Sequence, residues 1–300
     1  MQHKDMLYML SQRNRKETKM KIVIKFLKFI VMVILTLCLL FIFVRNTIIS
    51  TILSQKYILK QLEKTEFYSE VYKIAEANFE NYIDQSGLEE NVLNNICTQE
   101  KVRKDINIII SNIYEGTNEE IDTTEIASKL NSNIDNLNVR TAKNSNAIDE
   151  FVNHICESYK EAIINTKYES QINGLYKKTT NILEKINKML ITVIIISIIL
   201  LIIMNIKNIS KILADFAIIL LSTSFLQFIG INILKSKVDI LNIKVFNDAF
   251  SKTIVIIVQD IFSKINTVGI IMFGISILFI IIYEIIVYYK MFKNGKRVKE

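Results

Sequence analysis

The chain has 300 residues, of which 50% are hydrophobic, and it contains 7 Gly, no Pro and no Trp. So little Gly and Pro argues against a fold rich in β-turns and predicts an all-α protein. The formal net charge is +7. Its basic excess lies in segments that flank apolar runs, so it indicates membrane topology rather than a nucleic-acid partner.

Residues 26–48 are predicted to form the first transmembrane helix, behind a basic tail at residues 1–28. The apolar run from Phe26 to Val44 is interrupted only by Lys28, which lies close enough to one end to extend to the headgroups. A cleavable signal peptide is the alternative. The run is longer than the roughly 7–15 apolar residues of a signal peptide, and no small-x-small cleavage site follows, so we expect a retained signal-anchor.

Residues 50–187 are predicted to form a helical bundle of about five or six helices, because a segment of this length can bury a core of its own. Apolar residues recur at helical spacing, as in Phe67 and Val71 and again in Val102 and Ile106. We expect this bundle to fold by itself. The alternative is a composite unit that needs the polar segment at residues 235–266.

Capping residues predict several helix boundaries within this bundle. Helix starts are expected at three capping pairs: Ser86 with Glu89, Asp122 with Glu125, and Asn146 with Asp149. Gly116 predicts the end of the helix before it. The last helix, from about residue 148, is expected to continue into the second transmembrane helix.

Three further apolar runs predict transmembrane helices at residues 189–206, 212–234 and 267–289. A turn at residues 207–211 joins the first two of these. Residues 235–266 carry an apolar face with Phe250, Ile254 and Ile257 on it, which predicts an amphipathic helix that leads into the last span. This helix either packs on the predicted bundle or lies in the membrane interface.

Basic residues predict the orientation in the membrane. The tails at residues 1–28 and 290–300, together with the turn at residues 207–211, hold fifteen Lys and Arg against three acidic residues. An even number of spans separates each pair of these segments, so they share one side, which the positive-inside rule assigns to the cytoplasm. Residues 50–187, with fifteen basic and twenty-two acidic residues, are then extracytoplasmic. We expect a multi-pass protein of the cytoplasmic membrane with both termini inside.

Motifs that carry chemistry are nearly absent. The sequence has no phosphate-binding Gly-rich loop, nucleophile elbow, HExxH or CxxC. Of its two histidines, His3 lies in the basic tail, and His154 has no metal-ligand spacing apart from Cys156. We therefore expect His154 to be a solvated helix residue, and we expect no metal, no cofactor and no enzymatic activity.

Three cysteines differ in their expected surroundings. Cys38 lies in the first predicted span and is expected to behave as an apolar residue. Cys97 and Cys156 lie in the predicted extracytoplasmic bundle, where oxidation is possible. A disulfide between them would stabilise the bundle by a few kcal/mol, but two buried free thiols fit the spacing equally well.

Three polar side chains lie within the predicted spans: Asp215, Gln227 and Glu284. An ionisable group in hydrocarbon costs several kcal/mol, which makes each a candidate for an ion or proton site. Asp215 is four residues from Lys211 and Glu284 is six from Lys290, about 6 and 9 Å at helical rise. Both carboxylates are therefore expected near the cytoplasmic headgroups, where Lys side chains and water reduce the cost.

These patterns indicate an integral membrane protein that displays an acidic helical domain for binding a protein or an envelope component. The expected partners are membrane lipids and a protein partner or further copy, and not nucleic acid. The alternative is a subunit of a transporter or channel that uses Asp215 and Glu284 within the membrane. A membrane-embedded enzyme is the third class, and it lacks a paired nucleophile and base or a set of metal ligands.

Overall fold

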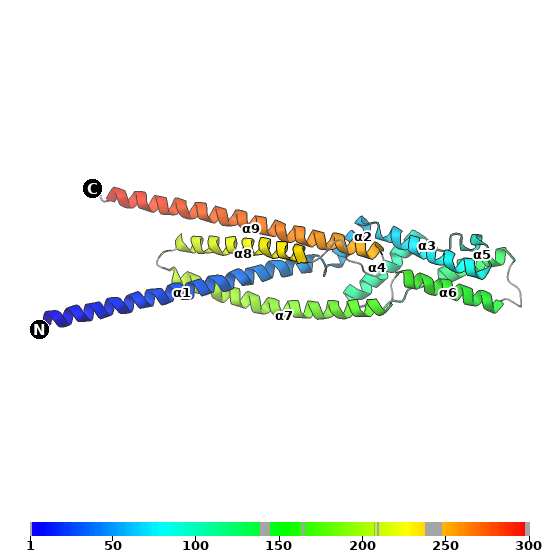
Figure 1. Ribbon diagram of the computed structural model, residues 1–300, viewed down its shortest axis with the longest axis horizontal. Coiled ribbons are helices and arrows are strands. Elements are labelled where there is room, and N and C mark those ends of the chain that lie inside the picture. Colours follow the sequence, from blue (N-terminus) through cyan, green and yellow to red (C-terminus); the bar gives the residue numbers. More distant parts are fainter. Residues whose placement is uncertain are drawn as a thin grey trace. The chain divides into compact units, whose positions relative to one another are not determined.

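The computed structural model describes residues 2–138, 145–163, 166–206, 208, 210–237 and 248–297. Within these ranges the chain forms helices and no strand, which confirms the all-α prediction for this part (Figure 1). In chain order the elements are α1 (Gln2–Ser50), α2 (Gln55–Lys64), α3 (Phe67–Ser86), the 3-10 helix η1 (Glu90–Leu93), α4 (Gln99–Glu115), α5 (Thr124–Asn136), α6 (Ser145–Ile163), α7 (Thr166–Met204), α8 (Ser210–Lys237) and α9 (Asp248–Arg297).

Four helical segments in the described part of the chain are long and apolar enough to cross a membrane: Lys19–Ser50, Ile172–Met204, Ser210–Lys237 and Asp248–Phe292. Each exceeds the roughly 20 residues that cover the hydrocarbon of a bilayer. Large apolar side chains on these segments are exposed, among them Phe29, Ile203 and Ile271. Such a surface is unfavourable in water and compatible with lipid, which suggests a multi-pass membrane protein.

The chain divides into two compact units. The span unit comprises Met1–Thr47, Leu183–Val238 and Ile261–Glu300, and the bundle unit comprises Ile48–Ile182 and Asp239–Asp260. Helices α1, α7 and α9 each contribute residues to both units.

In the span unit, α1, α7 and α8 share a small apolar core. Four side chains from these helices are buried together: Val31, Leu35, Leu201 and Ile219. Helix α9 packs against α8, where Ser224 Oγ donates a 2.8 Å hydrogen bond to the Gly269 carbonyl. A Cβ on Gly269 would lie 3.1 Å from Gln227 Oε1, so this crossing favours a residue without a side chain, as close contacts between membrane helices often do.

The bundle unit has a continuous apolar core. Helix α3 packs against α4 and α6, and α5 packs against α6 and η1. The apolar positions that helical spacing identified lie in this core, and Phe67, Val71, Val102, Ile106 and Ile109 are all buried. The predicted periodicity therefore located the buried faces of α3 and α4.

Of the four predicted boundary signals, two agree with the structure and one was wrong, and the fourth, Asn146, lies one residue inside α6 as described (Ser145–Ile163). Helix α4 ends at Glu115, and Gly116 follows with φ 74°. Helix α5 begins at Thr124, whose backbone N–H and hydroxyl both donate to Asp122 Oδ1. The predicted start at Ser86 was wrong, because α3 ends there and Gly87 follows with φ 70°. A glycine directly after the serine favours a helix end, since glycine adopts the left-handed conformation without strain.

Residues 248–260 pack on α2, α3 and the turn between them. The Phe250 ring meets the Phe67 ring edge-on, with centroids 4.7 Å apart, and the hydroxyls of Thr253 and Thr65 lie 3.0 Å apart. Asp260 accepts a 2.5 Å hydrogen bond from the Tyr57 hydroxyl. Of the two positions left open by the sequence, this part of the segment takes the one on the bundle and belongs to the bundle unit. The expected folding of residues 50–187 by themselves stays a prediction. Residues 238–247 lie outside the described residues. They include Phe246, four residues before Phe250, which the sequence pattern also assigns to the apolar face.

The single helix expected from about residue 148 into the second span is described as two elements, α6 (Ser145–Ile163) and α7 (Thr166–Met204). The continuity with the second span holds for α7. This helix runs without interruption from Thr166 to Met204, and so enters the predicted span at residues 189–206. Residues 164 and 165, between α6 and α7, lie outside the described part of the chain.

Candidate functional sites

Asp215, the first of the predicted intramembrane candidates, belongs to a buried polar cluster in the span unit. Lys28 Nζ lies 2.6 Å from Asp215 Oδ2 and donates a 3.0 Å hydrogen bond to Asn205 Oδ1. The Asn205 amide donates to the same Asp215 oxygen at 2.7 Å and to the Leu201 carbonyl at 2.8 Å. The Asp215 side chain is 9% exposed. The cluster joins α1, the end of α7 and α8.

The partner of Asp215 is not the lysine that chain spacing suggested. Lys211 is the nearest in sequence, but the ion pair is formed by Lys28 of α1, which the sequence placed at the headgroups. Both charges are paired and share one amide, the arrangement that lowers the cost of burying charge among membrane helices. The geometry therefore favours a structural connection between helices over a free ion site.

Gln227 and Glu284, the other two candidates, do not join this cluster. Gln227 of α8 is 2% exposed, and its side-chain oxygen and nitrogen have no hydrogen-bond partner among the described residues. Glu284 of α9 is exposed, and residues within the described ranges form no hydrogen bond or ion pair with it. The three predicted residues are thus separate features of the span unit.

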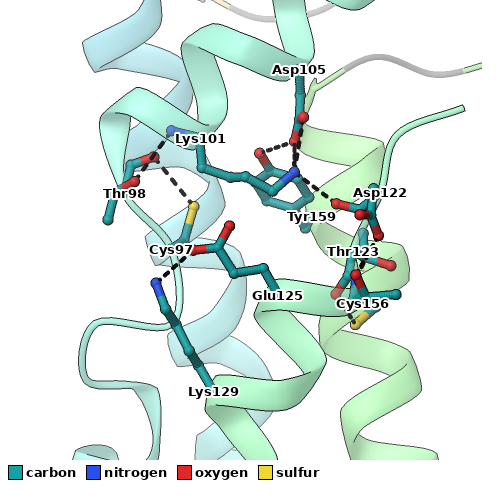
Figure 2. Close-up of polar contacts among 11 residues, drawn as sticks. Cys97, Thr98, Lys101, Asp105, Asp122, Thr123, Glu125, Lys129, Cys156 and Tyr159 are labelled. Carbon is teal, nitrogen blue, oxygen red and sulfur yellow. Dashed lines mark hydrogen bonds and ion pairs between the residues drawn. The ribbon is translucent and has the colours of Figure 1, made fainter. Parts of the chain in front are cut away.

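A second buried polar cluster lies in the bundle unit (Figure 2). Lys101 Nζ donates to both carboxylate oxygens of Asp105, at 2.8 and 2.6 Å, and to the Asp122 carbonyl at 2.7 Å. The Tyr159 hydroxyl donates to Asp105 Oδ2 at 2.6 Å. Asp105 is 1% exposed and Tyr159 is fully buried. The cluster connects α4 with α6 and with the segment that precedes α5.

Sequence reasoning missed this cluster, although a signal was present. Lys101 and Asp105 are spaced i, i+4, which allows an ion pair on a helix. Asp105 also precedes Ile106 on the face that carries Val102 and Ile109. A carboxylate on an apolar face needs a buried partner, so this position could have been identified. Tyr159 could not have been identified as the partner of Asp105, because it belongs to α6 and no sequence spacing connects it with α4.

The two cysteines of the bundle unit are free and buried, so the disulfide that the sequence left open is not formed in this structure. Cys97 Sγ donates to the Thr98 carbonyl at 3.7 Å, and Cys156 Sγ donates to the Thr123 carbonyl at 3.9 Å (Figure 2). Burial raises the pKa of Cys97 to about 12 and also raises the pKa of Cys156. Such thiols are protonated at neutral pH and are poor nucleophiles.

The described residues contain no group of three or more His, Cys, Asp or Glu side chains that could hold a metal ion. His154 is exposed on α6, and its ring stacks on the Tyr82 ring with centroids 5.9 Å apart. His154 is therefore an exposed helix residue of the bundle unit, as its spacing predicted.

A wide polar groove of about 1380 Å³ lies on the bundle unit, along α2, α3, α4 and the loop after α4. Five carboxylates line it: Glu63, Glu66, Glu100, Glu115 and Glu119. Arg103 and Lys104 are its two lining cations, and the Arg103 guanidinium pairs with Glu63 and lies 5.6 Å from the Tyr68 ring centroid. The groove therefore has an excess of negative charge.

No protein-family model, curated protein or solved structure matches this chain. Its class is given by its own fold: the described part of the chain is all-α, with four helices able to cross a membrane and a compact helical unit.

The bundle unit is expected to lose stability as the pH rises above about 9. Burial, together with the hydrogen bond to Asp105, raises the pKa of Tyr159 above its ordinary value of 10.0, and burial raises that of Cys97 from 9.0 to about 12. The folded state therefore holds protons that the unfolded state releases at high pH. The raised pKa values therefore contribute fully to the free energy of unfolding at pH values below the pKa values of the unfolded state. This contribution is lost as the pH rises through the pKa values of the folded state.

Thermal melting of the full-length protein in detergent, followed by circular dichroism between about pH 7 and pH 11, checks this expectation. Tyr159→Phe should make the fall above pH 10 less steep, because the titrating hydroxyl is gone. A melting temperature that is constant up to pH 11 would contradict the role of these buried groups.

Proposed function

We propose that the chain is a non-enzymatic protein of the cytoplasmic membrane that displays the acidic bundle of residues 50–187 outside the membrane, where it binds a cationic surface of a protein or envelope partner. The observation that carries the proposal is the polar groove of the bundle unit, with five carboxylates against two cations. The orientation is supported by the fifteen basic residues in the tails and in the turn at residues 207–211.

The size and charge of the groove favour a macromolecular partner. Its volume of about 1380 Å³ exceeds the roughly 300–1,000 Å³ of sites that enclose small molecules. An excess of carboxylates attracts cations before contact and raises the association rate of a basic partner. Because Arg103 pairs with Glu63, the carboxylates best placed to meet such a partner are the other four of the lining: Glu66, Glu100, Glu115 and Glu119.

The alternative, a transport subunit, has weaker support from the contacts. A pathway that uses Asp215 and Glu284 needs both carboxylates to face one aqueous route. Asp215 is engaged by Lys28 and Asn205, whereas Glu284 lies exposed on another helix. We therefore keep display of the bundle as the leading function.

Single cysteines in an otherwise Cys-free protein test both the topology and the groove. Glu119→Cys lies in the groove, the neighbouring Asn118→Cys lies outside its lining, and Lys211→Cys lies at the predicted cytoplasmic turn. In intact cells a membrane-impermeant maleimide should label the first two positions, and should label Lys211→Cys only after permeabilisation. A cationic partner should slow labelling of Glu119→Cys relative to Asn118→Cys, and a high-salt wash should restore it, because salt screens exposed ion pairs.

Labelling of Lys211→Cys from outside would overturn the orientation. Labelling of Glu119→Cys and Asn118→Cys at equal rates with and without the salt wash would leave the topology intact and refute binding in the groove.

A further inference from the structure

The bundle unit contains an apolar cavity that none of the sites above uses. Its volume is about 660 Å³, within the roughly 300–1,000 Å³ typical of sites that bind small molecules. Residues 48–53, parts of α2, α4, α7 and α9, and Phe67 and Ile163 surround it. Apart from Thr179 and Thr253, every lining side chain is aliphatic or aromatic.

The polar groups of this lining are largely satisfied within the protein. Thr253 shares a 3.0 Å hydrogen bond with Thr65, and the Tyr114 hydroxyl donates to the Ile52 carbonyl. Water is retained in a cavity only where it finds about two to four polar partners, and apolar cavities of this size bind apolar molecules. The lining therefore selects a hydrocarbon ligand over a polar one.

The cavity has an apolar rim at the surface of the bundle unit. Leu175 is 64% exposed, Ile52 is 45% exposed and Ile172 is 41% exposed, although all three line the cavity. On α7 the lining residues recur at helical spacing, from Ile172 through Leu175 and Tyr176 to Thr179. Large apolar side chains around an opening are a surface that a ligand is expected to cover.

The lining segments are neighbours of predicted membrane spans in the sequence, and this indicates the class of apolar ligand. The first predicted span ends at Ile48, and Ile52 and Leu53 follow it closely. Thr179 is ten residues before the predicted span at residues 189–206 on the continuous helix α7, and Ile257 is ten residues before residue 267 on α9. These lining segments are thus connected in the chain to helices that are expected to lie in lipid, which makes a lipid acyl chain the favoured apolar ligand.

We propose that this cavity binds one acyl chain of a membrane phospholipid, drawn from the leaflet next to the bundle unit. The driving force is removal of the apolar lining and rim from water, at about 25 cal/mol per Å² of apolar surface covered. The lipid then forms part of the core between α4, α7 and α9. The proposal goes beyond partner binding in the polar groove, and it holds for either orientation in the membrane.

Photolabelling tests the proposal on the full-length protein in lipid nanodiscs. The probe is a phospholipid with a diazirine near the end of one acyl chain, and peptide mapping locates the adducts after illumination. Adducts are expected on residues 106–114 of α4, which line the cavity and are distant in sequence from every predicted span.

Two substitutions at the exposed rim, Leu175→Trp and Ile52→Trp, should block the opening with little effect on folding. Each should reduce labelling of α4 by about tenfold, equivalent to about 1.4 kcal/mol. Leu137→Trp is the matched control, because Leu137 is a 37% exposed apolar residue of the same unit that does not line the cavity. It should leave labelling unchanged.

Adducts confined to the predicted spans would refute the proposal, and so would α4 labelling that both rim variants leave intact. If a free fatty acid with the same diazirine labels α4 while the phospholipid does not, the source of the chain is not the membrane lipid and the proposal also fails. None of these outcomes depends on the groove or on the orientation, so failure of the proposed function would be recognised separately.

Discussion

Replacing Asp105 with alanine is expected to increase amide hydrogen exchange in α4 and α6 by roughly a hundredfold to a thousandfold. Among the described residues, the substitution leaves the Lys101 ammonium, whose side chain is 10% exposed, with the Asp122 carbonyl and the Tyr159 ring face as partners and without a counter-charge. It also leaves the fully buried Tyr159 hydroxyl without its acceptor. Removing one member of a buried ion pair costs about 3–5 kcal/mol, because the remaining charge stays buried and unpaired.

Native-state exchange of the full-length protein, read by mass spectrometry, measures this loss as opening of the bundle unit. The matched control is Glu125→Ala. Glu125 and Lys129 form an ion pair of the same i, i+4 spacing, 2.9 Å apart, but their side chains are 55% and 40% exposed. Exposed pairs contribute little, so exchange should change by less than about threefold. Tyr159→Phe removes only the hydroxyl and should fall between the two, at about fivefold.

Equal exchange in Asp105→Ala and Glu125→Ala would contradict the importance of burial. It would show that water or a rearranged Lys101 replaces the carboxylate, and that α4 and α6 are held by apolar contacts alone.

The sequence was most informative about features that depend on the residues of a single helix. Periodicity identified Phe67, Val71, Val102 and Ile106 as buried because side chains at helical spacing share a face. Length and hydropathy identified the four long apolar helices of the described part of the chain, because both are properties of a single segment. Gly116 marked a helix end because its φ of 74° is unfavourable for other residues.

Sequence reasoning was less successful where a feature depends on partners from distant segments. Asp215 was identified as a costly intramembrane carboxylate, but its partner Lys28 belongs to another helix and no spacing rule connects them. The same holds for Tyr159 and Asp105. The apolar cavity combines segments near three predicted spans, and each lining residue by itself resembles an ordinary core position. Ser86 shows a different failure, because one short motif fits either a helix start or a helix end.

Replacing Lys28 with methionine is expected to loosen α1 in the span unit. The side-chain volume is nearly conserved, but among the described residues the Asp215 carboxylate keeps the Asn205 amide as its one partner. A buried carboxylate that loses its counter-charge costs about 3–5 kcal/mol. The double variant Lys28→Met with Asp215→Asn removes both charges and retains an amide that can bond Asn205. It should therefore recover most of the loss, because the destabilisation comes from the unpaired charge and not from the missing attraction.

Cys38 provides the measurement, since it is buried in α1 at 8% exposure. In a protein with Cys97 and Cys156 replaced by alanine, the rate at which a thiol reagent modifies Cys38 in detergent reports opening of α1. Lys28→Met should raise this rate by roughly a hundredfold. The matched control Lys25→Met, one turn earlier on the same helix and exposed, should leave it near that of the parent protein.

The double variant separates the two interpretations of Asp215. A structural ion pair requires that neutralising both partners restores slow modification of Cys38. If Lys28→Met is tolerated as well as Lys25→Met, the carboxylate does not need its partner for packing. It must then be protonated or hydrated in the absence of Lys28. That behaviour would favour the ion or proton site of the transport alternative, and it would displace the structural connection inferred from the 2.6 Å contact between Lys28 and Asp215.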